Sequence, residues 1–219
     1  MSNQGYVSET ESWHRKTIGE AACAALRKNG FDARYVDTGE EAAKLVEAMI
    51  TPGMTVATGG SITLHALKLH ERAEALGAKL LNHGAKGLSA DEKLAIMRAQ
   101  LTADLMLSST NALTLDGELL NIDGNGNRVA ALTFGPKKTV VIAGYNKITR
   151  NLEEAHARCE SIASPMNNKR LGTGNPCVRT GICADCRGEG RICKIYTVLR
   201  QRPRLSDFTV IVVGESLGY

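Results

Sequence analysis

The chain has 219 residues, of which 43% are hydrophobic and 4% aromatic, and its formal net charge is +4. This length and apolar content are enough for a sizeable core, whereas so few aromatic residues argue against a stacking platform for single-stranded nucleic acid. The first residues lack the apolar segment of a secretory signal, and no stretch approaches the roughly 18 apolar residues of a membrane span, so we expect a cytoplasmic protein without such a span.

Helical and strand patterns alternate along most of the chain. Thr38 with Glu41 and Ser89 with Glu92 have the spacing of capping boxes at helix starts, and Gly30 stands where a helix would end. The expected helices are 11–29, 41–49, 61–70, 91–104 and 152–164. The expected strands are 31–37, 54–60, 78–83, 105–110, 118–123, 139–145, 195–199 and 208–214. This alternation predicts an α/β fold with a largely parallel sheet.

We expect a single domain over residues 1–219, with a flexible N-terminus over 1–14. The composition changes at about Ser164, after which the chain is rich in Gly, Pro and Asn. We interpret 165–195 as a cysteine-rich loop insertion and not as an independent domain. Between Lys169 and Arg204, nine Lys or Arg and two Asp or Glu give a local charge of +7 and leave −3 for the rest of the chain. The positive charge therefore belongs to the region of the cysteines.

A glycine turn, ATGGS at 57–61, links a predicted strand to a predicted helix. Backbone amides in such a turn can approach a ligand closely, and the start of a helix favours negative charge. The turn can therefore bind a phosphate or a carboxylate, although it is neither a Walker motif nor GxGxxG. The alternative is a tight turn that Ser61 caps.

Polar side chains surround two apolar stretches between residues 108 and 132. We interpret ELLNID at 118–123 as a strand or hairpin that brings Asp123 and the following glycines to the edge of a cleft. Arg128 is of most interest, because a planar guanidinium suits a carboxylate or phosphate. Glu118 and Asp123 are candidate acid/base residues. Taken singly, each carboxylate is also explained as a turn former or helix cap, and DGNGN at 123–127 as a hairpin turn.

Four of the six cysteines lie within CVRTGICADCRGEGRIC at 177–193. These candidate metal ligands are Cys177, Cys183, Cys186 and Cys193. In a cytoplasmic protein their density favours a metal site over disulfides, with free or redox thiols as a further alternative. One C-x2-C pair suits tetrahedral Zn2+, and four thiolates among turn-forming glycines equally suit a 4Fe-4S iron-sulfur cluster. The spacing does not decide between the two.

Together, ATGGSITL, the segment from SSTNAL to NKI, the cysteine loop and VIVVGESLGY resemble a known family. The chain is similar to stand-alone LUD-domain proteins, the lactate utilization protein B/C domain family, over nearly its whole length. The resemblance implies the Rossmann-like open sheet of the NagB/RpiA/CoA-transferase-like superfamily, here with a cysteine-rich loop insertion. It also implies a substrate site that the catalytic candidates Asp123 and Arg128 share with further residues. The implied substrate-binding residues are Thr58, Gly59, Gly60, Ser61, Thr110, Asn111, Gly124 and Asn125.

The resemblance implies a role in lactate or related organic-acid utilisation, with a small anionic organic substrate and partner subunits of an organic-acid oxidising complex. The chain has no ferredoxin-like region and no flavin or nicotinamide fingerprint, which argues against lactate oxidation by this chain alone. One alternative is a non-catalytic assembly or binding module whose basic loop docks an acidic partner, nucleic acid being the poorer choice. The other is an isomerase or an acyl-transfer enzyme of the same superfamily, with Glu118 as the acyl acceptor.

Overall fold

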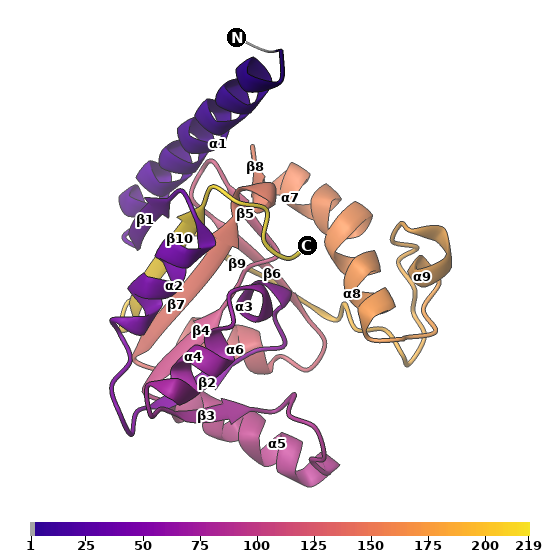
Figure 1. Cartoon of the computed structure of the whole chain (residues 1–219). Coiled ribbons are helices and arrows are strands. Elements are labelled where there is room, and N and C mark those ends of the chain that lie inside the picture. Colours follow the sequence, from indigo (N-terminus) through magenta and orange to yellow (C-terminus); the bar gives the residue numbers. More distant parts are fainter. Residues whose placement is uncertain (1–2) are drawn as a thin grey trace.

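The computed structural model describes residues 3–219, with side chains from Ser8 onwards (Figure 1). Six parallel strands form the main sheet, in the order β1-β10-β7-β4-β2-β3. In that order they are β1 (Asp32–Val36), β10 (Asp207–Val213), β7 (Lys138–Gly144), β4 (Leu105–Ser108), β2 (Thr55–Thr58) and β3 (Lys79–Asn82). The expected α/β fold with a largely parallel sheet is confirmed.

A second sheet of four strands lies beside the first, in the order β8-β5-β6-β9. Its strands are β8 (Ile148–Thr149), β5 (Ala112–Thr114), β6 (Leu119–Asp123) and β9 (Ile195–Leu199). The pairs β5–β6 and β6–β9 are antiparallel, whereas β5 pairs with β8 in parallel. The expected hairpin around ELLNID is therefore the β5–β6 pair.

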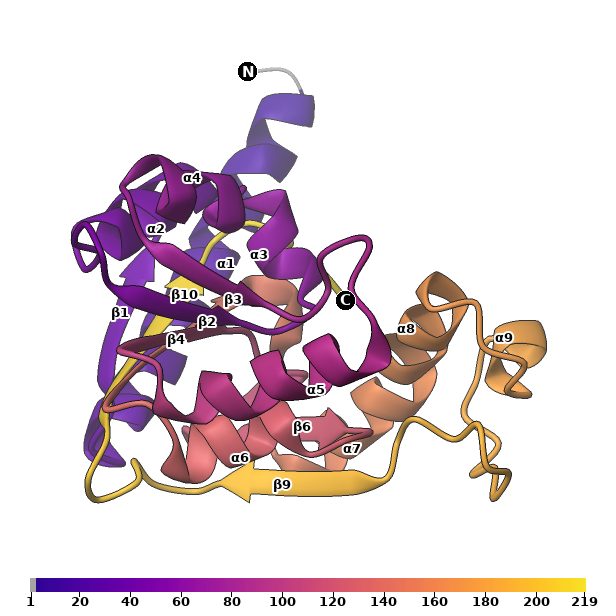
Figure 2. The same cartoon turned by 90° about the horizontal axis from the view of Figure 1, so that it is seen from below.

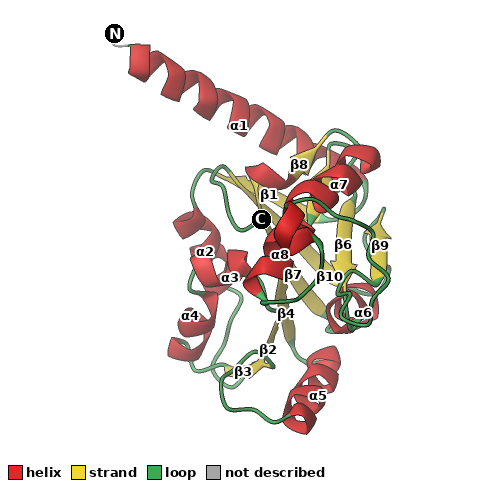
Figure 3. Cartoon of the chain, turned by 90° about the vertical axis from the view of Figure 1, so that its right-hand side faces the viewer, coloured by secondary structure: helices red, strands yellow, loops and turns green. Residues whose placement is uncertain are grey.

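Helices cover both faces of the main sheet (Figure 3). One face carries α2 (Gly39–Glu47), α3 (Ile62–Ala66) and α4 (Leu69–Ala75), and the other carries α1 (Asn3–Lys28), α6 (Asn127–Phe134) and the second sheet. The outer face of the second sheet packs against α7 (Leu152–Arg158). Figure 2 shows α5 (Ala90–Ala99) running beside α6.

Strand β7 shows how the sequence separates two cores. Val140 and Ile142 point into the cluster under α2–α4, and Val141 points into the cluster under α1 and the second sheet. This follows from the period of two residues along a strand. Each fully buried side chain of this kind contributes about 1.5–3 kcal/mol to stability. A strand buried on both faces is for this reason largely apolar, as the run VVIAG at 140–144 is.

Local signals set several helix boundaries. Both predicted capping boxes form, at Thr38 for α2 and at Ser89 for α5. Gly30 ends α1 with a positive φ of 85°. The expected helix 61–70 is divided in two, because Lys68 adopts a left-handed conformation (φ 52°) between α3 and α4.

Two sequence expectations differ from the structure. The alternative of a hairpin turn at DGNGN is wrong, because Gly126 is the N-cap of α6, a helix that the sequence pattern did not indicate. The helix expected to end at Ser164 continues through a π-helical turn (Cys159–Ala163) into α8 (Ser164–Arg170). The segment 165–195 thus begins as helix and contains a further short one, α9 (Cys177–Thr180).

Helix α1 begins at Asn3, so most of the segment 1–14 that was expected to be flexible is helical; Met1 and Ser2 lie outside the described residues. Figure 1 shows the N-terminal half of α1 extending away from the two sheets. None of the helices in the described residues is apolar over a length that would cross a membrane.

The C-terminal end of α1 is fixed to the turn between β5 and β6. Asn29 Nδ2 donates to the carbonyl oxygens of Asp116 (2.8 Å) and Gly117 (2.9 Å). Gly117 has φ 78°, and a Cβ at this position would lie 2.6 Å from the backbone carbon of Ala25. Only glycine allows both the left-handed backbone and this close approach.

Replacing Gly117 by Ala should therefore cost more than the left-handed conformation alone, which is about 1–2 kcal/mol. Gly87→Ala is the matched control, because Gly87 has φ 84° and nothing within 4 Å of an added Cβ. Urea unfolding should show a clearly larger loss of unfolding free energy for Gly117→Ala. Equal losses in the two variants would show that the contact with α1 is unimportant.

Candidate functional site

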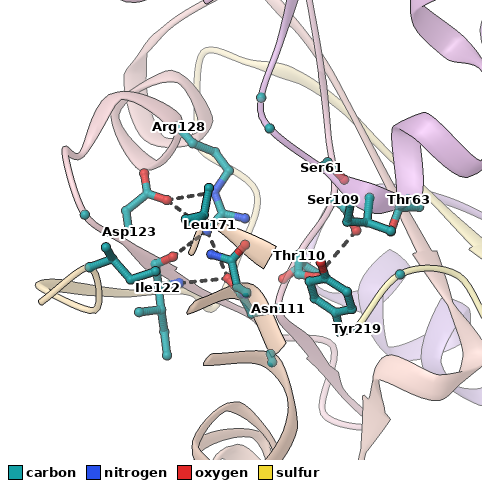
Figure 4. Close-up of a pocket in the computed structure, with 18 of the residues that line it drawn as sticks. Ser61, Thr63, Ser109, Thr110, Asn111, Ile122, Asp123, Arg128, Leu171 and Tyr219 are labelled. Carbon is teal, nitrogen blue, oxygen red and sulfur yellow. Dashed lines mark hydrogen bonds and ion pairs between the residues drawn. The ribbon is translucent and has the colours of Figure 1, made fainter. Parts of the chain in front are cut away.

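A cavity of about 270 Å³ lies at the carboxyl ends of β2, β4 and β7 (Figure 4). The strands are parallel, so the loops that follow them meet at one edge of the sheet, the usual ligand position in open α/β sheets. These loops contribute residues 59–61, 109–111 and Lys147 to the lining. The end of β6, the start of α6 and the helix α8 complete the walls.

The glycine turn leaves open space on one side of the cavity. A Cβ on Gly60 would meet nothing within 4 Å, and a Cβ on Gly59 would reach only the Arg128 Cδ at 3.9 Å. The Ser61 side chain accepts from the Leu64 amide and so caps α3, as expected. Because α3 has only five residues, its dipole adds little, and the turn amides are the main anion-binding groups that this segment offers.

Arg128 is held in place by residues of β6 and of the loop after β4. Its Nε donates to Asp123 Oδ1 (2.9 Å), and its Nη2 donates to Asn111 Oδ1 (2.9 Å) and to the Ile122 carbonyl (2.6 Å). Asp123 Oδ2 also accepts from the Val129 amide in the first turn of α6. Figure 4 shows this cluster on one side of the cavity and Ser61, Thr63 and Ser109 on the other.

Lys147 lies beneath the second group and is 3% exposed. Its Nζ donates to Ser109 Oγ (2.8 Å), Thr63 Oγ1 (3.0 Å) and the Thr110 carbonyl (3.2 Å). The two hydroxyls in turn donate to the backbone carbonyls of Ile142 and Leu217. The ammonium group thus has three hydrogen-bond acceptors but no carboxylate among the described residues within ion-pair distance.

A second buried cation, Arg158, lies nearby and is 8% exposed. It donates to the carbonyl oxygens of Asn111 (2.6 Å) and Asn146 (2.9 Å), and no ion pair of the described residues includes it. Burial, followed by the charges of Arg158 and Arg128, lowers the pKa of Lys147 from 10.5 to about 7. Lys147 in the cavity wall and Arg158 next to it thus have no carboxylate partner among the described residues.

His83 lines the cavity from the loop after β3. Its Nδ1 lies 3.0 Å from Nε2 of the buried Gln100, whose amide nitrogen also contacts the carbonyl oxygens of Thr58 and Leu81. A Gln100 amide that donates to Nδ1 leaves the proton of a neutral imidazole on Nε2. Burial lowers the pKa of His83, which favours the neutral ring.

The structure brings most of the predicted site residues to this cavity. The predicted residues that line it are Gly59, Gly60, Ser61, Thr110, Asn111, Asp123, Gly124, Asn125 and Arg128. Thr58 is fully buried at the end of β2, directly before the lining residues, and its Oγ1 has no hydrogen-bond partner within the described chain. Whether any of these residues binds substrate or takes part in catalysis remains a prediction.

Glu118 does not lie at this cavity. It precedes β6, whereas Asp123 ends that strand, so the Cα atoms of the two residues are about 16 Å apart at a strand rise of roughly 3.3 Å per residue. Its Oε1 accepts from Arg200 Nε (2.9 Å), and it lines a separate surface hollow with Asn29 and Asp116. The structure therefore separates Glu118 from the other two catalytic candidates.

Lys147 and Arg158 were not among the predicted site residues. Lys147 follows the buried strand β7, and polar residues directly after buried parallel strands are the signal that could have found it, as it found 109–111 after β4. Arg158 carries no such signal, because its position on a half-exposed helix is typical of a surface residue.

The cysteine loop joins α8 to β9 and packs against the cavity. The Cys183 amide donates to the Glu160 carbonyl in the π-helical turn (2.9 Å), and the Lys194 amide donates to the Asp123 carbonyl (2.9 Å). Arg191 crosses the loop, donating to Asp185 Oδ1, the Cys186 carbonyl and the Cys193 carbonyl. Ile192, between these anchors, lines the cavity.

The four thiols of the loop are free, and Cys177 is the buried one. Burial raises the pKa of the Cys177 thiol, and the neighbouring Cys193, Cys186 and Cys183 raise it further, which places all four in one neighbourhood. Within residues 3–219, however, no three His, Cys, Asp or Glu side chains are arranged to hold a metal ion. A bound metal would require the thiols to move closer together.

Comparisons with known proteins bear on the fold and the family. The LUD domain family model matches residues 19–213, and no curated protein sequence matches the chain. The crystal structure of a DUF162 family protein from Deinococcus radiodurans is similar to this chain with a TM-score of 0.52. The match covers 91% of this chain and 97% of the Deinococcus chain at 14% sequence identity, so the likeness shows the fold alone.

Lys147 predicts an unusual pH dependence of stability. The unfolded chain keeps this amine protonated to about pH 10, whereas the folded chain releases the proton near pH 7. Between these values the unfolded state binds more protons, so stability rises with pH, by at most ~1.4 kcal/mol per unit. Lys147→Met should lose this slope in urea unfolding between pH 7 and 8.5. The exposed control Lys93→Met should keep it; a wild-type slope in Lys147→Met would contradict the assignment.

Proposed function

Because the chain belongs to the LUD-domain family, we propose that it binds a small anionic organic molecule at the cavity and acts in lactate or related organic-acid utilisation. The observation that carries the proposal is the pair of buried basic side chains, Lys147 and Arg158, that have backbone and hydroxyl partners but no carboxylate partner among the described residues. An uncompensated buried charge costs several kcal/mol, and an anionic ligand would offset that cost. Ligand binding should therefore stabilise the protein.

The size and lining of the cavity support a small ligand. Its volume of about 270 Å³ is slightly below the range of sites for drug-sized molecules, so a small acid fits better than a dinucleotide. The turn at Gly59 and Gly60 can supply amides to a carboxylate or phosphate, and Ser61 and His83 can donate to further oxygens. Arg128 keeps its place opposite the glycine turn through its pairing with Asp123.

We propose two further features on the same basis. The fold is that of the NagB/RpiA/CoA-transferase-like superfamily, which the parallel main sheet and the added small sheet support. The protein acts in the cytoplasm, where reducing conditions keep its thiols free for a metal. Oxidation of a hydroxy acid needs an electron acceptor, and we propose that partner subunits of an organic-acid oxidising complex provide it.

We also propose that the cysteine loop binds Zn2+ or an iron-sulfur cluster. The ligands would be the four neighbouring thiols, which as thiolates match either occupant. Arg191 and the other basic residues of the loop would offset the resulting negative charge. The metal would brace the loop that forms one wall of the cavity or, as a cluster, transfer single electrons.

Anion binding can be tested by a substitution that fills the space beside the glycine turn. Lactate, pyruvate and sugar phosphates should raise the melting temperature of the wild type. At a ligand concentration of 100 times Kd, binding adds about 2.7 kcal/mol to the free energy of unfolding. Gly60→Ala should abolish this shift without loss of stability, since its Cβ meets no other atom. Gly174→Ala, equally free of contacts but outside the cavity, should keep it. The absence of stabilisation by every small acid and phosphate would refute the proposal.

Metal binding can be tested on protein purified without oxygen. Zinc, iron and acid-labile sulfide analysis should find one zinc ion or one cluster per chain. Cys186→Ser should lose it, whereas Cys23→Ala should retain it, because Cys23 is buried in the core under α1. Metal-free wild-type protein that gains no stability when zinc or iron and sulfide are added would exclude this part of the proposal.

A further inference from the structure

The Lys147 amine differs from the other groups of the cavity in its surroundings. It is almost completely buried, yet it belongs to the lining, and it lies within hydrogen-bond distance of two hydroxyls. A lysine whose only role was to neutralise protein charge would pair with a carboxylate. Lys147 pairs with none among the described residues, so its amine is available to a ligand.

We propose that Lys147 condenses with the aldehyde or ketone group of an anionic metabolite and forms an imine through its Nζ. The inference rests on the proposed function, because the anionic part of the same molecule would occupy the seat beside the glycine turn. The ligand class is thereby narrowed from small anions in general to those that carry a carbonyl group, either 2-oxo acids or ketose and aldose phosphates.

The reaction needs no oxidant or further reactant. The Nζ lone pair attacks the carbonyl carbon and forms a C–N bond, and the carbonyl oxygen takes up a proton to give a carbinolamine. The C–O bond then breaks, and both hydrogens of the amine leave with that oxygen as one molecule of water. The product is a C=N bond to Lys147, with no change in oxidation state.

The hydrogen bonds suit this chemistry. A neutral amine has two hydrogens, which match the two shorter contacts, to Ser109 Oγ and Thr63 Oγ1. Deprotonation removes the third hydrogen, and the longer hydrogen bond, to the Thr110 carbonyl at 3.2 Å, is the one that the neutral amine gives up. The two hydroxyls can also pass the protons that the condensation moves.

The positive neighbours of Lys147 favour its neutral form. Arg158 from α7 and Arg128 from α6 act on the amine in the same direction as burial, and the thiol of Cys159 opposes them weakly. With a pKa of about 7, a substantial fraction of the Lys147 amines is neutral at pH 7. An exposed lysine with a pKa near 10.4 is neutral in fewer than about one molecule in a thousand.

Reductive trapping tests the proposal on the wild-type chain. The protein is incubated at pH 7 with pyruvate or with dihydroxyacetone phosphate, each in the presence of cyanoborohydride, and is then analysed by intact mass and peptide mapping. One adduct per chain is expected, on Lys147, at a yield roughly a thousandfold above that on exposed Lys93, in keeping with the difference in neutral amine. The better of the two probes identifies the class of ligand.

Lactate, which has no carbonyl group to condense, should stabilise the protein without forming an adduct. Gly60→Ala should lower the yield on Lys147, because it blocks the anion seat, and should leave the yield on Lys93 unchanged. If small acids stabilise the wild type but no adduct forms on Lys147, the imine is refuted and the proposed anion site stands. If small acids neither stabilise the protein nor form an adduct, the proposed function fails as well.

Discussion

The Nζ of Lys147 lies where four segments of the chain meet. It follows β7, and it is hydrogen-bonded to Thr63 in α3 and to Ser109 and Thr110 after β4. Thr63 in turn donates to the Leu217 carbonyl beyond β10. Because the strands are parallel, these segments all reach the same edge of the sheet, and one amine fixes their spacing. The base of the cavity and the reactive group are therefore the same residue, so that a substitution at 147 changes both the shape of the site and its charge.

The opposite wall of the cavity, with Asp123 and Arg128, belongs to the second sheet and to α6. The β5–β6 hairpin carries Asp123 at one end, and its other end is fixed to α1 through Asn29 and Gly117. At its near end, Asp123 caps α6 and holds Arg128, so one carboxylate orients both a helix and a guanidinium. The site is thus formed between two sheets that pack on a common apolar core. Its width depends on how closely those sheets pack, and not on the loops alone.

Signals within a few residues of each other in the sequence were sufficient to predict much of the fold and of the cavity lining. Capping boxes at Thr38 and Ser89, the β-branched strands and the polar residues that follow β2, β4 and β6 were predicted, because each depends on neighbours within a few residues. Three features depend on distant parts of the chain and were not found. Lys147 is buried only because α3 and residues 217–218 close over it. Glu118 and Asp123 were both named as candidate acid/base residues, although strand β6 lies between them and separates the two. The helix over 152–164 was expected to end where the composition changes, but a π-helical turn carries it on into α8, with Pro165 in the first turn of that helix.

The π-helical turn at Cys159–Ala163 also constrains how the length of this chain can change during evolution. The turn holds one residue more than an α-helical path would need. Deletion of this one extra residue would leave a regular helix. Every later residue would then be rotated by about 100° around the helix axis, since there are 3.6 residues per turn. Asn167 and Leu171 would then leave the cavity wall, and the Glu160 carbonyl would no longer be free to hold Cys183. Insertions and deletions should for this reason be tolerated in the loops on either side of this helix far better than within it.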